Sequence, residues 1–223
     1  MGRDLYGVAL MLIRWEKHWF YDPAIPAHRI RHSCGAEFTP ELRCGTCGDE
    51  ITARETVSTD GPGAGLDPAQ KPRVQRRSIV PLENLSPNEA MLSRAFEVLS
   101  DRWTAHAIAA AFRGCRRFVD FQDELQAAPN ILTERLNRLV DLGVLKRVTY
   151  QDRPPRSEYR LTEEGRDLFP LIVELIRWGD RWLAGDRGPP QILMHRDGRH
   201  ALQPVIVCDQ CGQPADVGST SLP

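Results

Sequence analysis

Apolar residues follow helical spacing through most of the chain. Near the N-terminus they recur every three or four residues, which predicts a helix over residues 1–19. Four further amphipathic stretches follow between Asn88 and Gly143 and predict four helices. The last of these begins at Pro129, a residue well suited to a first helical turn. The inner face of this fourth helix carries Leu132, Leu136, Leu139 and Val140.

The pattern changes after Gly143. Residues 144–150 are β-branched and alternating, residues 151–156 contain a Pro-Pro turn, and residues 157–161 return as a partner strand. Thr162 is then expected to cap a long helix that ends near residue 184. This order of helices, turn, helix and hairpin predicts a mainly α fold with a small β-hairpin wing, the winged helix-turn-helix.

The chain also contains an internal repeat. Two tryptophan-bearing helices match at a constant spacing of 163 residues, and the match continues through a CxxC pair after a one-residue gap. The matched segments are Gly2–Leu5 with Gly165–Leu168, Leu12–Trp15 with Leu175–Trp178, Trp19 with Trp182, His32 with His195, Pro40 with Pro204, and Cys44–Cys47 with Cys208–Cys211. The first copy lacks the segment that precedes Gly165 in the second, so we expect it to be a C-terminal remnant.

These observations divide the chain into four parts. Residues 1–50 are expected to form the separate remnant, a terminal helix followed by a cysteine knuckle. Residues 51–87 are rich in Gly, Pro and charged residues and are expected to be a linker. Residues 88–184 are expected to form the winged helix with its dimerisation helix, and residues 185–223 a second cysteine knuckle and tail.

Composition excludes several classes of protein. With 41% hydrophobic residues the chain can bury a core, but no stretch reaches the roughly 18 uncharged apolar residues that a membrane span needs. The N-terminus lacks a signal-peptide layout, so we expect a cytoplasmic protein without membrane contact. No glycine-rich phosphate loop, nucleophile elbow or paired-carboxylate motif stands out, so we do not expect an enzyme.

Residues 90–184 resemble the HxlR-type family of winged-helix transcriptional regulators. The resemblance rests on four segments in the right order: Ser100–Thr104, Arg117–Phe121, Leu132–Leu136 and Pro154–Gly165. It implies a dimeric, sequence-specific binder of double-stranded DNA with no catalytic role. It covers somewhat under half of the chain, and the repeat implies that residues 2–19 are the matching end of a second, truncated domain.

The residues themselves agree with a DNA-binding function. With its leucines buried, the fourth helix directs polar side chains outward that suit the reading of base edges. Arginines beside the Pro-Pro turn and before the third helix suit phosphate contacts. The predicted DNA-binding residues are Asn130, Thr133, Glu134, Asn137, Arg138, Arg116, Arg117, Arg153 and Arg156. Arg135 lies at the edge of the buried stripe, where an ion pair with Asp101 or Asp120 is an equal alternative to DNA contact.

The helix from residue 162 carries a broad apolar and aromatic stripe, which usually meets another helix. We expect it to form a homodimer interface through Leu168, Ile172, Leu175, Trp178 and Trp182. The remnant helix has a similar stripe and offers two arrangements. It can dock on this helix within its own chain and imitate a dimer, or lie outside a true dimer. We favour the second arrangement, because a palindrome requires two readers.

The cysteines suggest a metal. In the first copy His32, Cys34, Cys44 and Cys47 supply four potential zinc ligands, and the CxxC spacing suits tetrahedral coordination. In the second copy the position of Cys34 falls on Asp197 or Gly198, so either zinc was lost there or the knuckle never needed it. The rival to a DNA-binding regulator is a degraded paralogue that acts as an interaction protein through its helices and knuckles.

Overall fold

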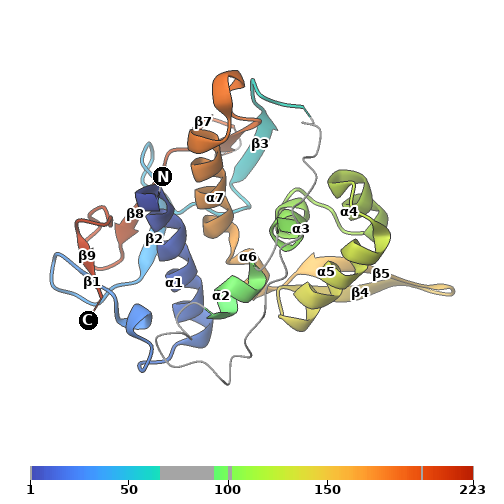
Figure 1. The fold of residues 1–223 in the computed structure, drawn as a ribbon, viewed down its shortest axis with the longest axis horizontal. Coiled ribbons are helices and arrows are strands. Elements are labelled where there is room, and N and C mark those ends of the chain that lie inside the picture. The colour runs from blue at the N-terminus through green and yellow to red at the C-terminus, as the bar shows by residue number, and fades with distance from the viewer. Residues whose placement is uncertain (1, 66–92, 100–101, 197, 223) are drawn as a thin grey trace.

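The computed structural model describes residues 2–65, 93–99, 102–196 and 198–222 (Figure 1). The winged helix occupies one side of the molecule, and the N-terminal helix and most small strands occupy the other. Within the described residues, no helix combines the length and apolar character needed to cross a membrane.

The winged helix-turn-helix is confirmed. It consists of α2 (Ser93–Val98), α3 (Arg102–Phe112), α4 (Phe118–Leu125) and α5 (Pro129–Asp141), followed by the antiparallel hairpin β4 (Leu145–Asp152) and β5 (Pro155–Leu161). Ile108, Phe121 and Leu136 are completely buried where these helices meet. Their burial fixes which side of α5 faces the solvent.

The predicted helix over residues 162–184 is two helices, α6 (Glu163–Arg166) and α7 (Phe169–Trp182), followed by the short η4 (Gly185–Arg187). Thr162 caps α6 as expected, because its Oγ1 accepts a hydrogen bond from the backbone N–H of Gly165 at 3.0 Å. Pro170 lies in the first turn of α7, where its lack of an N–H costs nothing. The break between the helices therefore falls immediately before Phe169.

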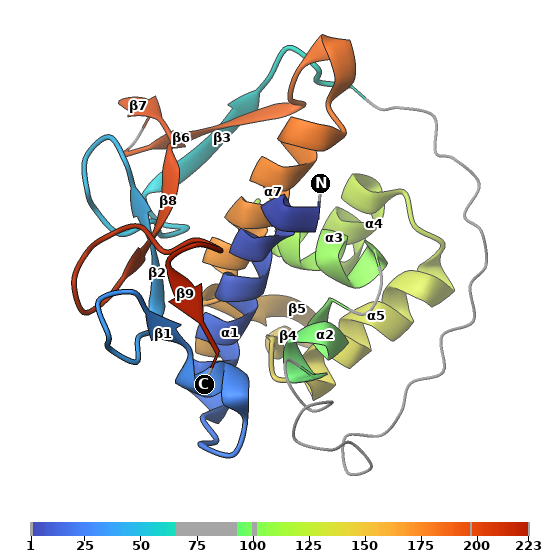
Figure 2. The same cartoon turned by 60° about the vertical axis from the view of Figure 1, so that its left-hand side comes forward.

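The N-terminal remnant is not a separate unit. After the short η1 (Gly2–Leu5), α1 (Tyr6–Phe20) packs along α7 (Figures 1 and 2). Trp15 Nε1 donates to the carbonyl oxygen of Glu164 at 2.9 Å, and Arg14 pairs with Asp167 at 2.7 Å. The first copy of the repeat thus lies on the helices of the second.

The small sheets join the two copies as well. In the first copy the elements are η2 (Pro26–Arg29), β1 (Arg31–His32), β2 (Pro40–Cys44) and β3 (Thr56–Asp60). In the second they are β6 (Gln191–His195), β7 (His200–Ala201), β8 (Pro204–Cys208) and β9 (Thr220–Ser221). All pairs are antiparallel, and β1 pairs with β9, β2 with β8, and β3 with β6, which also pairs with β7.

The strand β3 corrects the predicted linker over residues 51–87. Ile51 is 1% exposed, and residues 56–60 pair with β6, so the ordered first copy extends about ten residues beyond the predicted boundary. The Thr, Val and Ser residues at 56–59 favour a strand, whereas the Gly and Pro residues that follow them favour a linker. The part of the predicted linker from residue 66 to 87 lies outside the described residues.

The strand register reveals an approximate two-fold axis within the chain. At the centre of the β2–β8 pair Leu42 lies opposite Ile206, and these residues are equivalent in the repeat. The two outer strand pairs, β1–β9 and β3–β6, are related by the same axis. His32 lies opposite Thr220 in β1–β9, and its equivalent His195 lies opposite Thr56 in β3–β6. The two copies therefore face each other as two subunits of a symmetric dimer do.

Candidate nucleic-acid interface

The outer face of α5 presents polar side chains, as the spacing predicted. Asn130, Thr133 and Glu134 are exposed. The Thr133 hydroxyl donates to the carbonyl oxygen of Pro129 at 2.8 Å, and Glu134 pairs with Arg135 at 2.7 Å. These contacts stay within the helix, so the outer face of α5 remains exposed to solvent.

Two other predicted residues, Asn137 and Arg138, are partly buried beside the hairpin. The Asn137 side-chain oxygen accepts a hydrogen bond from the Arg147 guanidinium, which also lies 5.8 Å above the Tyr159 ring. Arg147 thus connects α5 to the wing. Arg147 is not among the DNA-binding residues that the sequence predicts, although its place on a strand next to a second basic residue, Lys146, is a signal that it lies near the predicted surface.

The wing presents its predicted cations at its tip. Arg153 and Arg156 are exposed on either side of the Pro-Pro turn between β4 and β5. In Figure 1 this hairpin projects beyond α5 and away from the body of the molecule. Its arginines can therefore reach a phosphate backbone that runs beside a docked α5.

The turn before α4 is fixed by Asp120. Its carboxylate accepts hydrogen bonds from the backbone N–H groups of Arg117 at 2.8 Å and Arg116 at 3.1 Å, which lower the pKa of Asp120. The Arg117 guanidinium lies 5.0 Å above the Tyr150 ring of the wing. Asp120, one of the partners considered for Arg135, therefore caps α4 instead, and the other, Asp101, lies outside the described residues.

The stripe expected to form a homodimer lies on α7 against the body of the same chain. Leu168 and Ile172 are buried, Leu175 and Trp178 are partly buried, and Trp182 is 40% exposed. The hydrogen bonds of α1 with this part of the chain fall on Glu164 and Asp167, beside the stripe. The structure thus has the other arrangement that the sequence left open, with the remnant helix docked on α7 within its own chain, and the homodimer through this stripe stays a prediction. The sequence match between residues 2–19 and residues 165–182 does not by itself show whether the helix that packs on α7 comes from the same chain or from another.

The predicted metal ligands His32, Cys34, Cys44 and Cys47 do not form one set. His32 and Cys34 join Cys208 and Cys211, and we call these four the three-cysteine cluster. Cys44 and Cys47 join His195 and His200, and we call these four the two-histidine cluster. Spacing along the chain predicts a CxxC pair with a histidine of its own copy, whereas the two-fold packing brings each CxxC pair to a histidine of the other copy.

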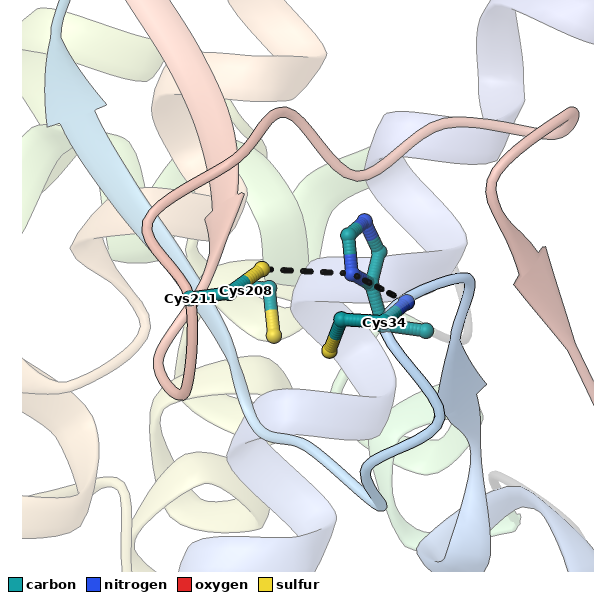
Figure 3. Close-up of side chains that lie close together, drawn as sticks. Cys34, Cys208 and Cys211 are labelled. Atoms are coloured by element: carbon teal, nitrogen blue, oxygen red, sulfur yellow. Dashed lines mark hydrogen bonds between the residues drawn. The ribbon is translucent and has the colours of Figure 1, made fainter.

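Figure 3 shows the three-cysteine cluster, where Cys34 on one segment faces Cys208 and Cys211 on the other. His32 Nδ1 lies 3.4 Å from Cys211 Sγ and 3.4 Å from the backbone nitrogen of Cys34. A backbone hydrogen bond at Ala36, followed by the His32 side chain, lowers the pKa of the Cys34 thiol to about 7.

The two-histidine cluster has a similar arrangement. Cys47 Sγ lies 3.5 Å from His195 Nδ1, and Cys44 Sγ lies 3.3 Å from His200 Nε2. Burial opposes ionisation of Cys44, but backbone hydrogen bonds at Gln203, Cys47 and Thr46 hold the pKa of this thiol at about 5. Both clusters thus contain a cysteine that ionises more easily than an ordinary thiol.

Known proteins resemble this chain in sequence and structure. Residues 98–187 match the family described as HxlR-like helix-turn-helix. The HTH-type transcriptional regulator MT3179 of Mycobacterium tuberculosis is 45% identical over 123 residues, which are 55% of this chain and 77% of that protein. YvaP of Bacillus subtilis, also an HTH-type transcriptional regulator, is 34% identical over 91 residues, which are 40% of this chain and 84% of YvaP. The crystal structure of PA1607, described as a candidate transcription factor, superposes with a TM-score of 0.54 at 32% identity, covering 59% of this chain and 92% of that one. The chain belongs to the HxlR-like helix-turn-helix family of transcriptional regulators.

Proposed function

We propose that this protein regulates transcription by binding double-stranded DNA through α5 and the β4–β5 wing, and that it has no enzymatic activity. The observation that carries the DNA-binding part is the continuity of the surface. Arg147 ties the wing to Asn137 on α5, and Arg117 stacks on Tyr150 of the wing. Helix and hairpin are thus held in one relative position.

This surface separates two kinds of contact. The exposed residues Asn130 and Glu134 on α5 match base edges in the major groove, because Asn pairs with adenine and Glu accepts from the amino group of cytosine. Arg153 and Arg156 at the wing tip match phosphates, whose contribution is independent of sequence. The helix therefore supplies specificity and the wing supplies affinity.

The packing of α1 on α7 supports a single winged-helix reader within the described residues. The approximate two-fold axis relates the second copy, which carries the winged helix, to the first, which ends in α1 and the β1–β3 strands. A dimer of complete domains would place a second reader across this axis. Here α1 and the β1–β3 strands lie across the axis, and the described residues contain one winged helix, which is expected to read one half-site.

Fluorescence anisotropy with labelled duplexes tests the DNA-binding proposal. The variant Arg153→Ala/Arg156→Ala is expected to weaken binding to every duplex and to reduce the slope of log K against log salt by about 2, one unit for each lost phosphate contact. The control Arg29→Ala/Arg54→Ala removes one arginine from η2 and one from the segment between β2 and β3, both outside the winged helix, and is expected to bind as the unaltered protein does. If the unaltered protein binds no duplex even at low salt, the chain is an interaction protein and the proposal fails.

A further inference from the structure

We propose that the chain holds two zinc ions, one in the three-cysteine cluster and one in the two-histidine cluster, and that each ion joins the two halves of the repeat. In both clusters the four ligand atoms lie within 4.8 Å of one another. The three-cysteine cluster takes two ligands from residues 32–34 and two from residues 208–211. The two-histidine cluster takes two from residues 44–47 and two from residues 195–200.

The distances between ligand atoms match those around a tetrahedral zinc ion. Bonds of about 2.3 Å to sulfur and about 2.0 Å to nitrogen at tetrahedral angles separate neighbouring ligand atoms by roughly 3.3 to 3.8 Å, and a sulfur–nitrogen pair by about 3.5 Å. The measured sulfur–nitrogen separations are 3.3 Å for Cys44 and His200, 3.4 Å for Cys211 and His32, and 3.5 Å for Cys47 and His195. All six cysteines are free thiols, so none of the ligands is consumed by a disulfide.

The two equivalent histidines are oriented as metal ligands are. Each turns Nδ1 toward the thiols and Nε2 away from them. His32 Nε2 lies 3.2 Å from the carbonyl oxygen of Pro214, and His195 Nε2 lies 3.9 Å from the Glu55 carboxylate. The Pro214 carbonyl is an outer partner of the kind that fixes the tautomer and orientation of a ligating imidazole, whereas His195 Nε2 makes no hydrogen bond within the described residues. Both side chains are buried, His195 completely, so these orientations are set by the fold.

The two CxxC turns are built alike and are preformed. The N–H of Gly48 donates to the carbonyl oxygen of Cys44 at 2.7 Å, and the N–H of its equivalent Gly212 donates to that of Cys208 at 2.8 Å. Both glycines have a positive φ, 79° and 70°, which favours glycine over other residues. The turns bring the two thiols of each pair to one side, as chelation of a single ion requires.

The fourth ligand distinguishes the sites. His32, Cys208 and Cys211 correspond in the repeat to His195, Cys44 and Cys47, but Cys34 has no cysteine counterpart. His200 takes its place from a position five residues after His195, within β7. The ligand sets are therefore Cys3His and Cys2His2, both closed sets that suit a structural zinc. With four protein ligands and no open position, these ions would stabilise the packing of the two halves.

Metal analysis of paired variants tests this assignment. The purified full-length protein is expected to contain two zinc ions per chain. Cys34→Ser/Cys208→Ser alters one cluster and is expected to retain one ion, whereas Cys34→Ser/Cys44→Ser alters both clusters and is expected to lose both. If each ligand set came from a single copy, Cys34→Ser/Cys208→Ser would lose both ions and Cys34→Ser/Cys44→Ser would retain one. Cys115→Ser, which changes the remaining cysteine, serves as the control and is expected to keep two ions.

Cobalt substitution keeps the test decisive if a serine variant does not fold. The thiolate-to-cobalt absorption is expected to divide between the sites in a ratio of three to two, following their cysteine count. Cys34→His retains four ligands and is expected to bind two cobalt ions with equal absorption from the two sites. An unaltered protein without bound metal, or one with disulfides between Cys44 and Cys47 or between Cys208 and Cys211, would overturn the proposal, as would the reverse order of the double variants.

Discussion

Leu42 on β2 and Ile206 on β8 lie opposite each other at the centre of their strand pair, and they occupy the same position in the two copies of the repeat. They are 2% and 7% exposed. A contact between equivalent residues on an axis is the mark of a two-fold interface between identical subunits. Here both sides of the interface belong to one chain, so its formation is part of folding.

This contact predicts that shortening either side chain destabilises the whole protein. Leu42→Ala and Ile206→Ala are each expected to lower the free energy of unfolding by about 2 to 5 kcal/mol, since a buried aliphatic side chain is replaced by a cavity. Urea denaturation measures the change. Val57→Ala, at a side chain that is 40% exposed on β3, is the control and is expected to change the value by less than about 0.5 kcal/mol. Losses below about 1 kcal/mol at Leu42 and Ile206 would show that the two copies do not fold together.

Two helical glycines are expected to respond oppositely to alanine. A Cβ on Gly165 in α6 would lie 2.1 Å from the backbone oxygen of Val144, so Gly165→Ala is expected to destabilise the protein although alanine favours helices. A Cβ on Gly179 in α7 would have no heavy atom within 4 Å, so Gly179→Ala is expected to stabilise the protein by about 0.5 to 1 kcal/mol. Thermal unfolding of both variants checks the pair, and a stabilised Gly165→Ala would contradict the packing of α6 on the wing.

Glu174 on α7 is expected to make stability fall as the pH rises. Burial raises the pKa of this carboxyl, an effect that Arg177 at 3.4 Å only partly opposes. The folded state therefore binds a proton more tightly than the unfolded state, and its advantage is lost as the pH rises from the ordinary carboxyl pKa through the raised one. Glu174→Gln is expected to be the more stable protein at pH 7.5 and to lose this advantage near pH 4.5. A difference in unfolding free energy between the two proteins that is the same at every pH would contradict the raised pKa of Glu174.

Asn130 on α5 is expected to contribute to base discrimination. Asn130→Ala is expected to reduce the difference in binding free energy between a preferred duplex and a scrambled one by about 1 to 3 kcal/mol, while binding to the scrambled duplex stays unchanged. Competition titrations measure both quantities. Equal weakening toward both duplexes would place Asn130 on the phosphate backbone.

The helices, the wing and the repeat could be predicted because each depends on local patterns. The spacing of Leu132, Leu136 and Leu139 fixes the face of α5, and the alternation after Gly143 fixes the hairpin. The partners of these local units could not be predicted in the same way. Cys44 lies 12 residues from His32 in sequence, yet the two-fold packing sends them to different clusters.

His200 shows the limit most clearly. The one-residue gap in the repeat hides its relation to Cys34, since neither residue aligns with a ligand of the other copy. Only the pairing of β6 with β7 turns His200 toward Cys44. The repeat itself was the available signal. Two matching segments in one chain suggest that each contacts the other, and ligands drawn from both segments follow from that contact.

The mass of the full-length protein in solution tests most directly whether one chain supplies both halves of the two-fold scaffold. Light scattering across a range of micromolar concentrations is expected to give one chain, about 25.2 kDa, because α1 and the β1–β3 strands already pair with α7 and the β6, β8 and β9 strands of the same chain. Twice that mass, independent of concentration, would show that the copies pair between chains and would contradict the account.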